Sequence, residues 1–333
     1  MSGENGLTAI LERFPATRTV LYGDLVLDRY VLGTPKRISR EAPVIILRWE
    51  GEEDVPGGGA NALANLAAMG SPVVPVGIVG DDEAGAALLA ALQRRGVDTS
   101  AVLTVPGYRT PTKVRILGGG PSSLKHQVAR YDIEPEPPGD GPWRSELVRR
   151  LTEVARGSAA VAVSDYGYGA VFPEALAGLA HLPGRPGWIT LDSRFRLGEL
   201  AGVDGATPNL EELESWAGRR LASDAEVAEA AEGLRAVLGA RFVLATRGPR
   251  GMTLAEAGKP AVHIPIHGTD QVADVTGAGD TVLAALTLAL AAGAAPGEAA
   301  RLANVAGGLV VMKSGTATVS REELAEALRG SGA

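Results

Sequence analysis

The segment DVTGAGDT, residues 274–281, places two glycines and an alanine directly before an acidic side chain that opens a long apolar run. The first N–H groups of a helix have no partner within the helix, and the helix dipole adds partial positive charge, so a helix start binds anions. Glycine lets a phosphate approach the backbone closely. An aspartate beside a phosphate is useful as a general base when a hydroxyl attacks phosphorus. The segment therefore indicates phosphoryl transfer with Asp280 as the base. The alternative is a plain turn followed by an acid that favours the helix start.

Three other signatures of enzymes that bind phosphates or nucleotides are missing from the sequence. There is no G-x-x-x-x-G-K-[ST] loop, no H-R-D with D-F-G, and no intact G-x-G-x-x-G after the first predicted strand. P-loop enzymes, protein kinases and nicotinamide-dependent enzymes are therefore disfavoured. The four histidines lack a metal-ligand spacing, and a chain without cysteine has neither disulfides nor thiolate chemistry.

The composition is that of a globular protein with a sizeable core. The 333 residues are 45% hydrophobic and 21% charged, with a net charge of −7, which argues against nucleic acid as the main partner. The first residues lack the basic start and apolar core of a signal peptide. The most apolar run, 281–296, is shorter than the roughly 20 residues that span a membrane. We expect a cytoplasmic protein with small-molecule ligands and no membrane partner.

Strand-like and helix-like stretches alternate along most of the chain. The apolar run at 18–30, broken by Gly23 and Asp24, is interpreted as a first core strand, and strand–helix alternation resumes after residue 158. The chain ends in three predicted helices, at 277–292, 296–312 and 321–329. This order predicts an α/β protein whose mostly parallel sheet is covered by helices.

Two segments, about 29–56 and 101–133, differ from this alternation. They contain short alternating pieces separated by turns, and we expect them to form a small β-sheet that lies over the main layer as a lid. No linker separates independent domains, so we expect a single domain over 1–333. Exposed strands with an apolar face, such as VIILRW at 44–49, tend to pair or to be covered. A homodimer through the lid is therefore expected.

Four segments, in order along the chain, resemble motifs of the ribokinase-like (PfkB) sugar kinases. DVTGAGDT resembles the C-terminal signature of that family. PGGGANALANLAAMG at 56–70 is similar to the family's sugar-side Gly-Gly and Asn segment. TPNLEELE at 207–214 is similar to its N-x-x-E element. ATRGPRGM at 245–252 is similar to its T-[RK]-G-x-x-G nucleotide loop. The resemblance covers about residues 18–329. It implies a ribokinase-like three-layer α/β/α fold with a β-sheet lid, and ATP- and Mg²⁺-dependent phosphorylation of a sugar hydroxyl.

The opening GDLVLDRYVLGTPKRISREAPV, residues 23–44, resembles that of the D-glycero-β-D-manno-heptose 7-phosphate kinases of the ADP-heptose pathway. The segments SDYGYGA and KSGTATVSREEL also resemble this subgroup. The implied acceptor is the anomeric hydroxyl of the heptose phosphate. Two segments depart from the subgroup, because LGGGPSSLKHQ at 117–127 is longer than the usual turn and DSRF at 192–195 replaces D-P-K-G. The alternatives are a kinase for another sugar, sugar phosphate or nucleoside, and a non-catalytic sugar or nucleotide sensor.

The resemblance implies roles for residues at matching positions. The general base is Asp280, and the backbone donors to the moving phosphoryl group are Gly277, Ala278 and Gly279. The sugar site is formed by Asp28, Gly57, Gly58 and Asn61. The nucleotide is contacted by Thr246, Gly248, Gly251 and Asn304. Packing, capping or turn formation is the structural alternative for each of these residues.

Two ion sites are also implied. Asn209 and Glu212 are one helical turn apart and would place the phosphates and, through water, Mg²⁺. A K⁺ or similar monovalent cation would bind at Asp274, Thr276 and Gly315.

A phosphorylated substrate requires a cationic clamp, and the lid carries suitable side chains. Guanidinium groups hold phosphate in a bidentate way. The candidates are Lys113, Arg115, Lys125 and Arg130, together with Lys36, Arg37 and Arg40. The alternative for each is an ordinary solvated charge.

Overall fold

The computed structural model describes residues 3–120, 125–268 and 273–330. In these residues the main sheet has eight strands, in the order β14-β13-β12-β11-β10-β9-β1-β4. They are β1 (Thr19–Gly23), β4 (Val73–Val76), β9 (Ala160–Asp165), β10 (Trp188–Ser193), β11 (Gly205–Ala206), β12 (Phe242–Thr246), β13 (Met252–Glu256) and β14 (Val262–Ile264). All neighbours pair in parallel except at the β12–β13 and β13–β14 pairs, which are antiparallel. The predicted mostly parallel sheet is confirmed.

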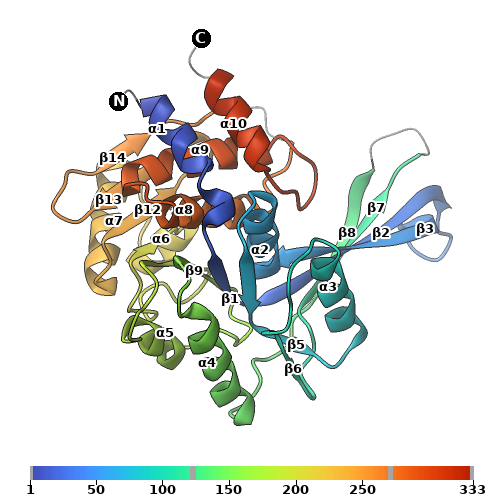
Figure 1. The fold of residues 1–333 in the computed structure, drawn as a ribbon. Helices are drawn as coiled ribbons and strands as arrows, with labels where there is room; N and C mark the ends of the chain where they lie inside the picture. The colour runs from blue at the N-terminus through green and yellow to red at the C-terminus, as the bar shows by residue number, and fades with distance from the viewer. Residues whose placement is uncertain (1–2, 121–124, 269–272, 331–333) are drawn as a thin grey trace.

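Helices cover both faces of this sheet (Figure 1). One face packs against α1 (Gly3–Leu11), α2 (Gly59–Ala68), α8 (Ala278–Ala291), α9 (Pro296–Val310) and α10 (Arg321–Gly330). The other packs against α4 (Pro142–Ala155), α5 (Pro173–Ala180), α6 (Leu210–Ala217) and α7 (Asp224–Leu238). Successive side chains of a strand point to opposite faces, so Leu21 of β1 joins the first core while Val20 and Tyr22 join the second. The chain therefore has three α/β/α layers, and none of its described helices has the length and apolar character needed to cross a bilayer.

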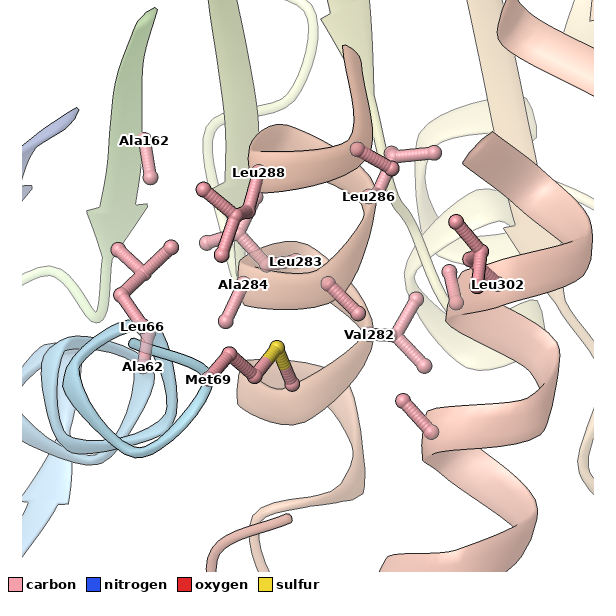
Figure 2. Packing of buried hydrophobic residues seen from close by; sticks show 14 of the residues in the cluster. Ala62, Leu66, Met69, Ala162, Val282, Leu283, Ala284, Leu286, Leu288 and Leu302 are labelled. Atoms are coloured by element: carbon pink, nitrogen blue, oxygen red, sulfur yellow. The ribbon is translucent and has the colours of Figure 1, made fainter. Parts of the chain in front are cut away.

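Helix α8 is buried from Asp280 to Leu290. Figure 2 shows it between α2, which contributes Leu66, and α9, which contributes Leu302. A helix surrounded by apolar neighbours must itself be apolar all round, which explains the run that follows Asp280. The first turn of α8 is thus held by the packed core, and the residues at its start inherit a fixed position.

The lid is a second, four-stranded sheet in the order β3-β2-β7-β8. Its strands are β2 (Leu25–Ile38), β3 (Ile45–Gly58), β7 (Thr112–Gly118) and β8 (His126–Ile133). Figure 1 shows this sheet projecting from one side of the body, beside α3 (Glu83–Gln93). The expected lid included residues from 101 onward, but β6 (Leu103–Val105) pairs instead with β5 (Ile78–Gly80) in a two-stranded sheet. Within the long turn at 117–127, residues 121–124 lie outside the described part of the chain.

The prediction of one core strand over 18–30 is wrong, because the chain passes from the body to the lid at Asp24. β1 ends at Gly23 and β2 begins at Leu25. A Cβ on Gly23 would lie 2.3 Å from the carbonyl oxygen of Ser164, so only glycine fits this crossing. Gly23 and Asp24 interrupt the apolar run, but the first residues of β2 are as buried as those of β1, so apolar character does not distinguish the two strands.

Candidate active site

Asp280 lies in the first turn of α8, and its side chain is buried. Asn61 of α2 donates its Nδ2–H to Asp280 Oδ2 at 3.0 Å, and the Tyr166 hydroxyl donates to Oδ1 at 2.9 Å. Burial raises the pKa of Asp280 to about 6, although both hydrogen bonds and the nearby Lys113 favour the charged form. The carboxyl group is therefore a proton acceptor whose affinity for a proton is above that of an ordinary aspartate.

The backbone before Asp280 is shaped for a close approach. Gly277 is the N-cap of α8 and has φ of +76°, a left-handed conformation that side chains rarely adopt. A Cβ on Gly277 would lie 2.4 Å from Asn61 Nδ2. Gly277, Ala278 and Gly279 line a pocket of about 490 Å³ together with Asp280. The structure thus brings the predicted loop, the predicted base and an open volume to the same helix end.

Asp28 of β2 lies on the lid side of this region and is buried. The Thr316 hydroxyl donates to Asp28 Oδ2 at 2.7 Å. Arg115 Nη1 of β7 forms an ion pair with Asp28 Oδ1 at 2.9 Å. Neither of these two atoms has a hydrogen-bond partner of good geometry among the described residues. These two buried groups of opposite charge therefore retain hydrogen-bonding capacity for a ligand.

The glycines of the sugar-side motif lie close to Asp28 and to the strand that carries it. A Cβ on Gly57 would lie 2.6 Å from Asp28 Cγ, and Gly58, with φ of +52°, would place a Cβ 2.7 Å from Val26. Side chains at these positions would displace Asp28 or the strand that carries it. The glycine motif therefore keeps the carboxylate in place as well as leaving the site open.

The lid registers place a row of charged residues on one face. Asp28 is paired with Lys113 and Lys113 with Asp132, while Arg115 is paired with Arg130. Paired residues of neighbouring strands point to the same face. Lys113 and Arg115 are both buried, and burial lowers the pKa of Lys113 against the opposing charges of Asp28 and Asp280.

The remaining cationic candidates pair with other acidic residues or lie at the far end of the lid. Arg130 chelates Asp132 on β8, and Lys125 forms an ion pair with Glu50. Lys36, Arg37 and Arg40 are exposed at the far end of the β2–β3 hairpin. At about 3.3 Å per residue, Lys36 lies roughly 25 Å along the strand from Asp28. The structure therefore brings Arg115 to the site, leaves Arg130 on the same lid face, and directs Lys125 toward another lid strand.

Asp192 and Glu212 are two of the acidic residues that line the pocket with Asp280. Asn209 is the N-cap of α6, and its side chain and that of Glu212 form a reciprocal capping box. Glu212 also faces the pocket, where burial raises its pKa to about 7. Asp192, at the end of β10, has its pKa raised well above the ordinary value by burial, by Glu212 and by Asp280. The capping alternative for Asn209 is thus observed, and it leaves the two carboxylates facing the pocket.

A second pocket of about 480 Å³ adjoins the first. It is more apolar and shares the start of α8 with the first. The predicted nucleotide residues Thr246, Gly248, Gly251 and Asn304 all line it. Asn304 of α9 donates its Nδ2–H to the carbonyl of Pro265 at 2.8 Å, which fixes the orientation of its amide. The predicted nucleotide residues are therefore brought together around one cavity.

Asp274 accepts hydrogen bonds from the backbone N–H groups of Thr276, at 2.9 Å, and Gly315, at 3.0 Å. The three residues predicted for a monovalent cation are therefore neighbours. Gly315 precedes Thr316, whose hydroxyl contacts Asp28, so this corner of the molecule is linked to the lid.

Sequence reasoning gave no role to Tyr166, Asp192 or Thr316. Tyr166 belongs to the SDYGYGA segment and Asp192 to the DSRF segment, and the sequence comparison with the heptose kinases singled out both segments. Tyr166 follows β9 and Asp192 lies near the carboxyl end of β10, and ligands bind at the carboxyl ends of strands in open α/β sheets. That position was the signal that could have selected them, whereas Thr316, in the KSGTATVSREEL segment, follows helix α9 and no strand.

Comparison with known proteins agrees with this arrangement. The sequence matches the pfkB family carbohydrate kinase profile over residues 17–124 and 196–323. The bifunctional protein HldE of Mesorhizobium japonicum is 38% identical over 96% of this chain and 63% of its own length. HldE of Halorhodospira halophila is 42% identical over 97% of this chain and 66% of its own length. The chain therefore spans less than two thirds of the length of these relatives.

Solved structures show the same fold. Escherichia coli phosphofructokinase-2 in complex with substrates and products has a TM-score of 0.74 at 19% identity, over 94% of this chain and 99% of its own. The same enzyme in complex with potassium gives 0.75 at 21%, over 95% and 99%. Arabidopsis thaliana ribokinase with ribose and ATP gives 0.70 at 22%, over 94% and 99%. The fold is ribokinase-like, and the chain belongs to the pfkB family of carbohydrate kinases, the ATP-dependent sugar kinases.

Proposed function

We propose that the protein transfers the γ-phosphoryl group of ATP to the anomeric hydroxyl of D-glycero-D-manno-heptose 7-phosphate. The observation that carries the substrate assignment is the buried pair of cations, Lys113 and Arg115, on the lid face beside Asp28. An unphosphorylated sugar needs hydroxyl acceptors and donors, whereas two buried cations suit an anionic acceptor. The resemblance of residues 23–44 to the heptose 7-phosphate kinases supports the same choice.

In the proposed reaction Asp28 accepts hydrogen bonds from sugar hydroxyls while Asn61 and the glycines form the floor of the site. Asp280 takes the proton from the attacking hydroxyl as its oxygen bonds to the γ-phosphorus, and the bond from that phosphorus to the β-phosphate oxygen breaks, releasing ADP. The N–H groups of Gly277 and Gly279 stabilise the charge on the moving phosphoryl group. The N–H of Ala278, predicted as a third donor, instead donates to the carbonyl oxygen of Val275 at 3.2 Å.

ATP would bind across the two adjoining pockets, with its base between Asn304 and the turn at Gly248 and Gly251. The described residues contain no cluster of three or more side chains able to hold a metal by themselves. Asp192 and Glu212 fit Mg²⁺ held mainly by phosphates and water, because a cation would relieve the repulsion between these neighbouring carboxylates. Bound Mg²⁺ would neutralise charge on the transferring phosphates.

A monovalent cation such as K⁺ would bind beside Asp274, Thr276 and Gly315. The proximity of these residues supports the site, and its link through Thr316 to Asp28 would connect the ion to the sugar side. The lid would also form a homodimer interface. Strand β3 is a sheet edge, and Trp49, Ile38 and Val44 are 65%, 63% and 56% exposed.

The substrate is tested by coupled ADP release with ATP and Mg²⁺ on a panel of acceptors. The panel pairs D-glycero-D-manno-heptose with its 7-phosphate and adds sedoheptulose 7-phosphate, fructose 6-phosphate, ribose and adenosine. We expect the highest kcat/KM for the heptose phosphate, and we expect Arg115→Ala to reduce its advantage over the unphosphorylated heptose. Lys36→Ala is the matched control, because Lys36 lies at the far end of the lid. Preference for an unphosphorylated sugar would contradict the substrate assignment.

A further inference from the structure

We propose that Tyr166 is a positioning residue for the base, because its hydroxyl and the Asn61 amide together fix the orientation of the Asp280 carboxylate. The inference rests on the proposed function in taking Asp280 as the group that removes the proton. Tyr166 follows β9, on a different part of the chain from α2 and α8, and its hydroxyl reaches into the pocket where phosphoryl transfer is proposed.

The contacts assign one donor to each carboxylate oxygen. Tyr166 donates to Asp280 Oδ1 at 2.9 Å, and Asn61 donates to Oδ2 at 3.0 Å. An ionised carboxylate offers about four lone-pair sites, so each oxygen keeps acceptor capacity for a substrate hydroxyl. Rotation of the carboxylate would break both contacts. The group is therefore held in one plane before the substrate arrives, which is the condition for efficient proton transfer.

The Tyr166 hydroxyl remains a donor under working conditions. Burial, followed by the charges of Asp280 and Asp192, raises the pKa of Tyr166 well above its ordinary value, so the phenol stays protonated. The Lys113 ammonium lies 4.8 Å from the centre of the Tyr166 ring, within the range of a cation–π contact. Tyr166 thus contacts the base through its hydroxyl and Lys113 of the lid through its ring.

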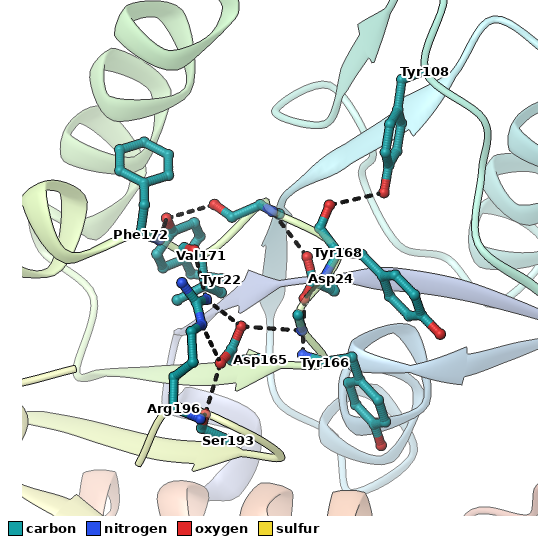
Figure 3. Close-up of polar contacts among 12 residues, drawn as sticks. Tyr22, Asp24, Tyr108, Asp165, Tyr166, Tyr168, Val171, Phe172, Ser193 and Arg196 are labelled. Carbon is teal, nitrogen blue, oxygen red and sulfur yellow. Dashed lines mark hydrogen bonds and ion pairs between the residues drawn. The ribbon is translucent and has the colours of Figure 1, made fainter. Parts of the chain in front are cut away.

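The loop that carries Tyr166 is anchored by buried carboxylates (Figure 3). Asp24 Oδ2 accepts the backbone N–H groups of Tyr166, at 2.8 Å, and Tyr168, at 3.0 Å, while Oδ1 accepts that of Ala170, at 2.9 Å. At the start of the loop, Asp165 accepts hydrogen bonds from the Ser193 hydroxyl and from Arg196 Nη2. These contacts fix the backbone on both sides of Tyr166. The backbone that carries the Tyr166 side chain is consequently fixed by the body of the protein.

The groups that face Asp280 come from several elements. Asn61 lies on α2, Lys113 on β7, Asp28 on β2 and Asp192 on β10, in addition to Tyr166. Of these, Tyr166, Asn61 and Lys113 favour the charged carboxylate and Asp28 opposes it. Removing the Tyr166 hydroxyl leaves the other groups in place, so the pKa of Asp280 should rise. A purely structural role for the ring would leave that pKa unchanged.

The test compares Tyr166→Phe with the wild type by kcat, KM and the pH profile of kcat/KM. We expect kcat to fall about 10- to 100-fold, because a hydrogen bond to a charged group is lost. We expect the sugar KM to change much less, and the acid limb of the profile to move to higher pH. Tyr168→Phe is the matched control, since its hydroxyl lies in the same loop but donates to Glu134. Unchanged kcat and an unchanged acid limb in Tyr166→Phe would overturn the inference, as would equal losses in both variants.

A second measurement requires no substrate. The carboxyl carbon resonance of Asp280, assigned by its loss in Asp280→Asn, is titrated by NMR in the free enzyme labelled at aspartate. We expect a higher pKa in Tyr166→Phe and a lower one when 3,5-difluorotyrosine, a stronger donor, replaces Tyr166. An Asp280 titration that both changes leave unmoved would overturn the inference. Failure of the wild type to phosphorylate heptose 7-phosphate would instead overturn the substrate proposal and leave this titration interpretable.

Discussion

Replacing Gly277 by alanine is expected to break the hydrogen bond that Asn61 donates to the base, Asp280. Gly277 has φ of +76°, and a Cβ there would lie 2.4 Å from Asn61 Nδ2. The left-handed backbone costs a side chain roughly 1–2 kcal/mol. Asn61 must also move, which breaks its hydrogen bond to Asp280, and such a bond to a charged group contributes about 1.5–3 kcal/mol. If that bond is needed in the transition state, kcat falls by about 10- to 150-fold.

Gly258→Ala is the matched control. Gly258 has φ of +73°, and a Cβ there would meet no atom within 4 Å. The control therefore carries the backbone strain without the collision. Coupled ADP release gives kcat, and urea unfolding gives the free energy of unfolding. We expect both variants to lose stability but only Gly277→Ala to lose kcat. Full kcat in Gly277→Ala, or an equal loss of kcat in Gly258→Ala, would refute the reasoning.

Three further predictions concern the general base, the metal site and the lid. Because burial raises the pKa of Asp280 to about 6 and the base must be ionised, kcat/KM should fall as pH decreases through about 6; an inflection near the ordinary aspartate value of 3.8 would contradict this assignment. Asp192→Asn should raise the Mg²⁺ concentration for half-maximal activity by about 10-fold in a titration at fixed ATP, and an unchanged requirement would remove Asp192 from the metal site. Trp49→Glu should convert a dimer to a monomer in light scattering at micromolar concentration, whereas a monomeric wild type would exclude the lid interface.

The parts of the fold that could be predicted are those encoded locally. The apolar run after Asp280 and the glycines before it mark a buried helix and its start, and α8 begins within one residue of the expected position. The passage of the chain into the lid sheet at Asp24 could not be predicted in the same way. It depends on backbone N–H groups about 140 residues along the chain, at Tyr166, Tyr168 and Ala170, and apolar patterning carries no record of them.

The site follows the same division. The resemblance supplied Asp280, Asn61 and Asp28 as separate motifs, and the structure brings the first two into contact. The contacts of Tyr166 with Asp280 and of Arg115 with Asp28 required the strand registers and the side-chain directions. The sequence gave no reason to distinguish Lys125 from Arg115, since both are cations of the lid. In the structure Arg115 lies at the site beside Asp28, whereas Lys125 forms an ion pair with Glu50.

Analysis of the products by ³¹P NMR tests the central claim most directly. Wild-type protein and Asp280→Asn are each incubated with ATP, Mg²⁺ and D-glycero-D-manno-heptose 7-phosphate. The account predicts one new anomeric phosphate resonance per ADP formed by the wild type, and a rate about 10²- to 10⁴-fold lower in Asp280→Asn. Absence of an anomeric phosphate, or equal rates for the two proteins, would contradict it.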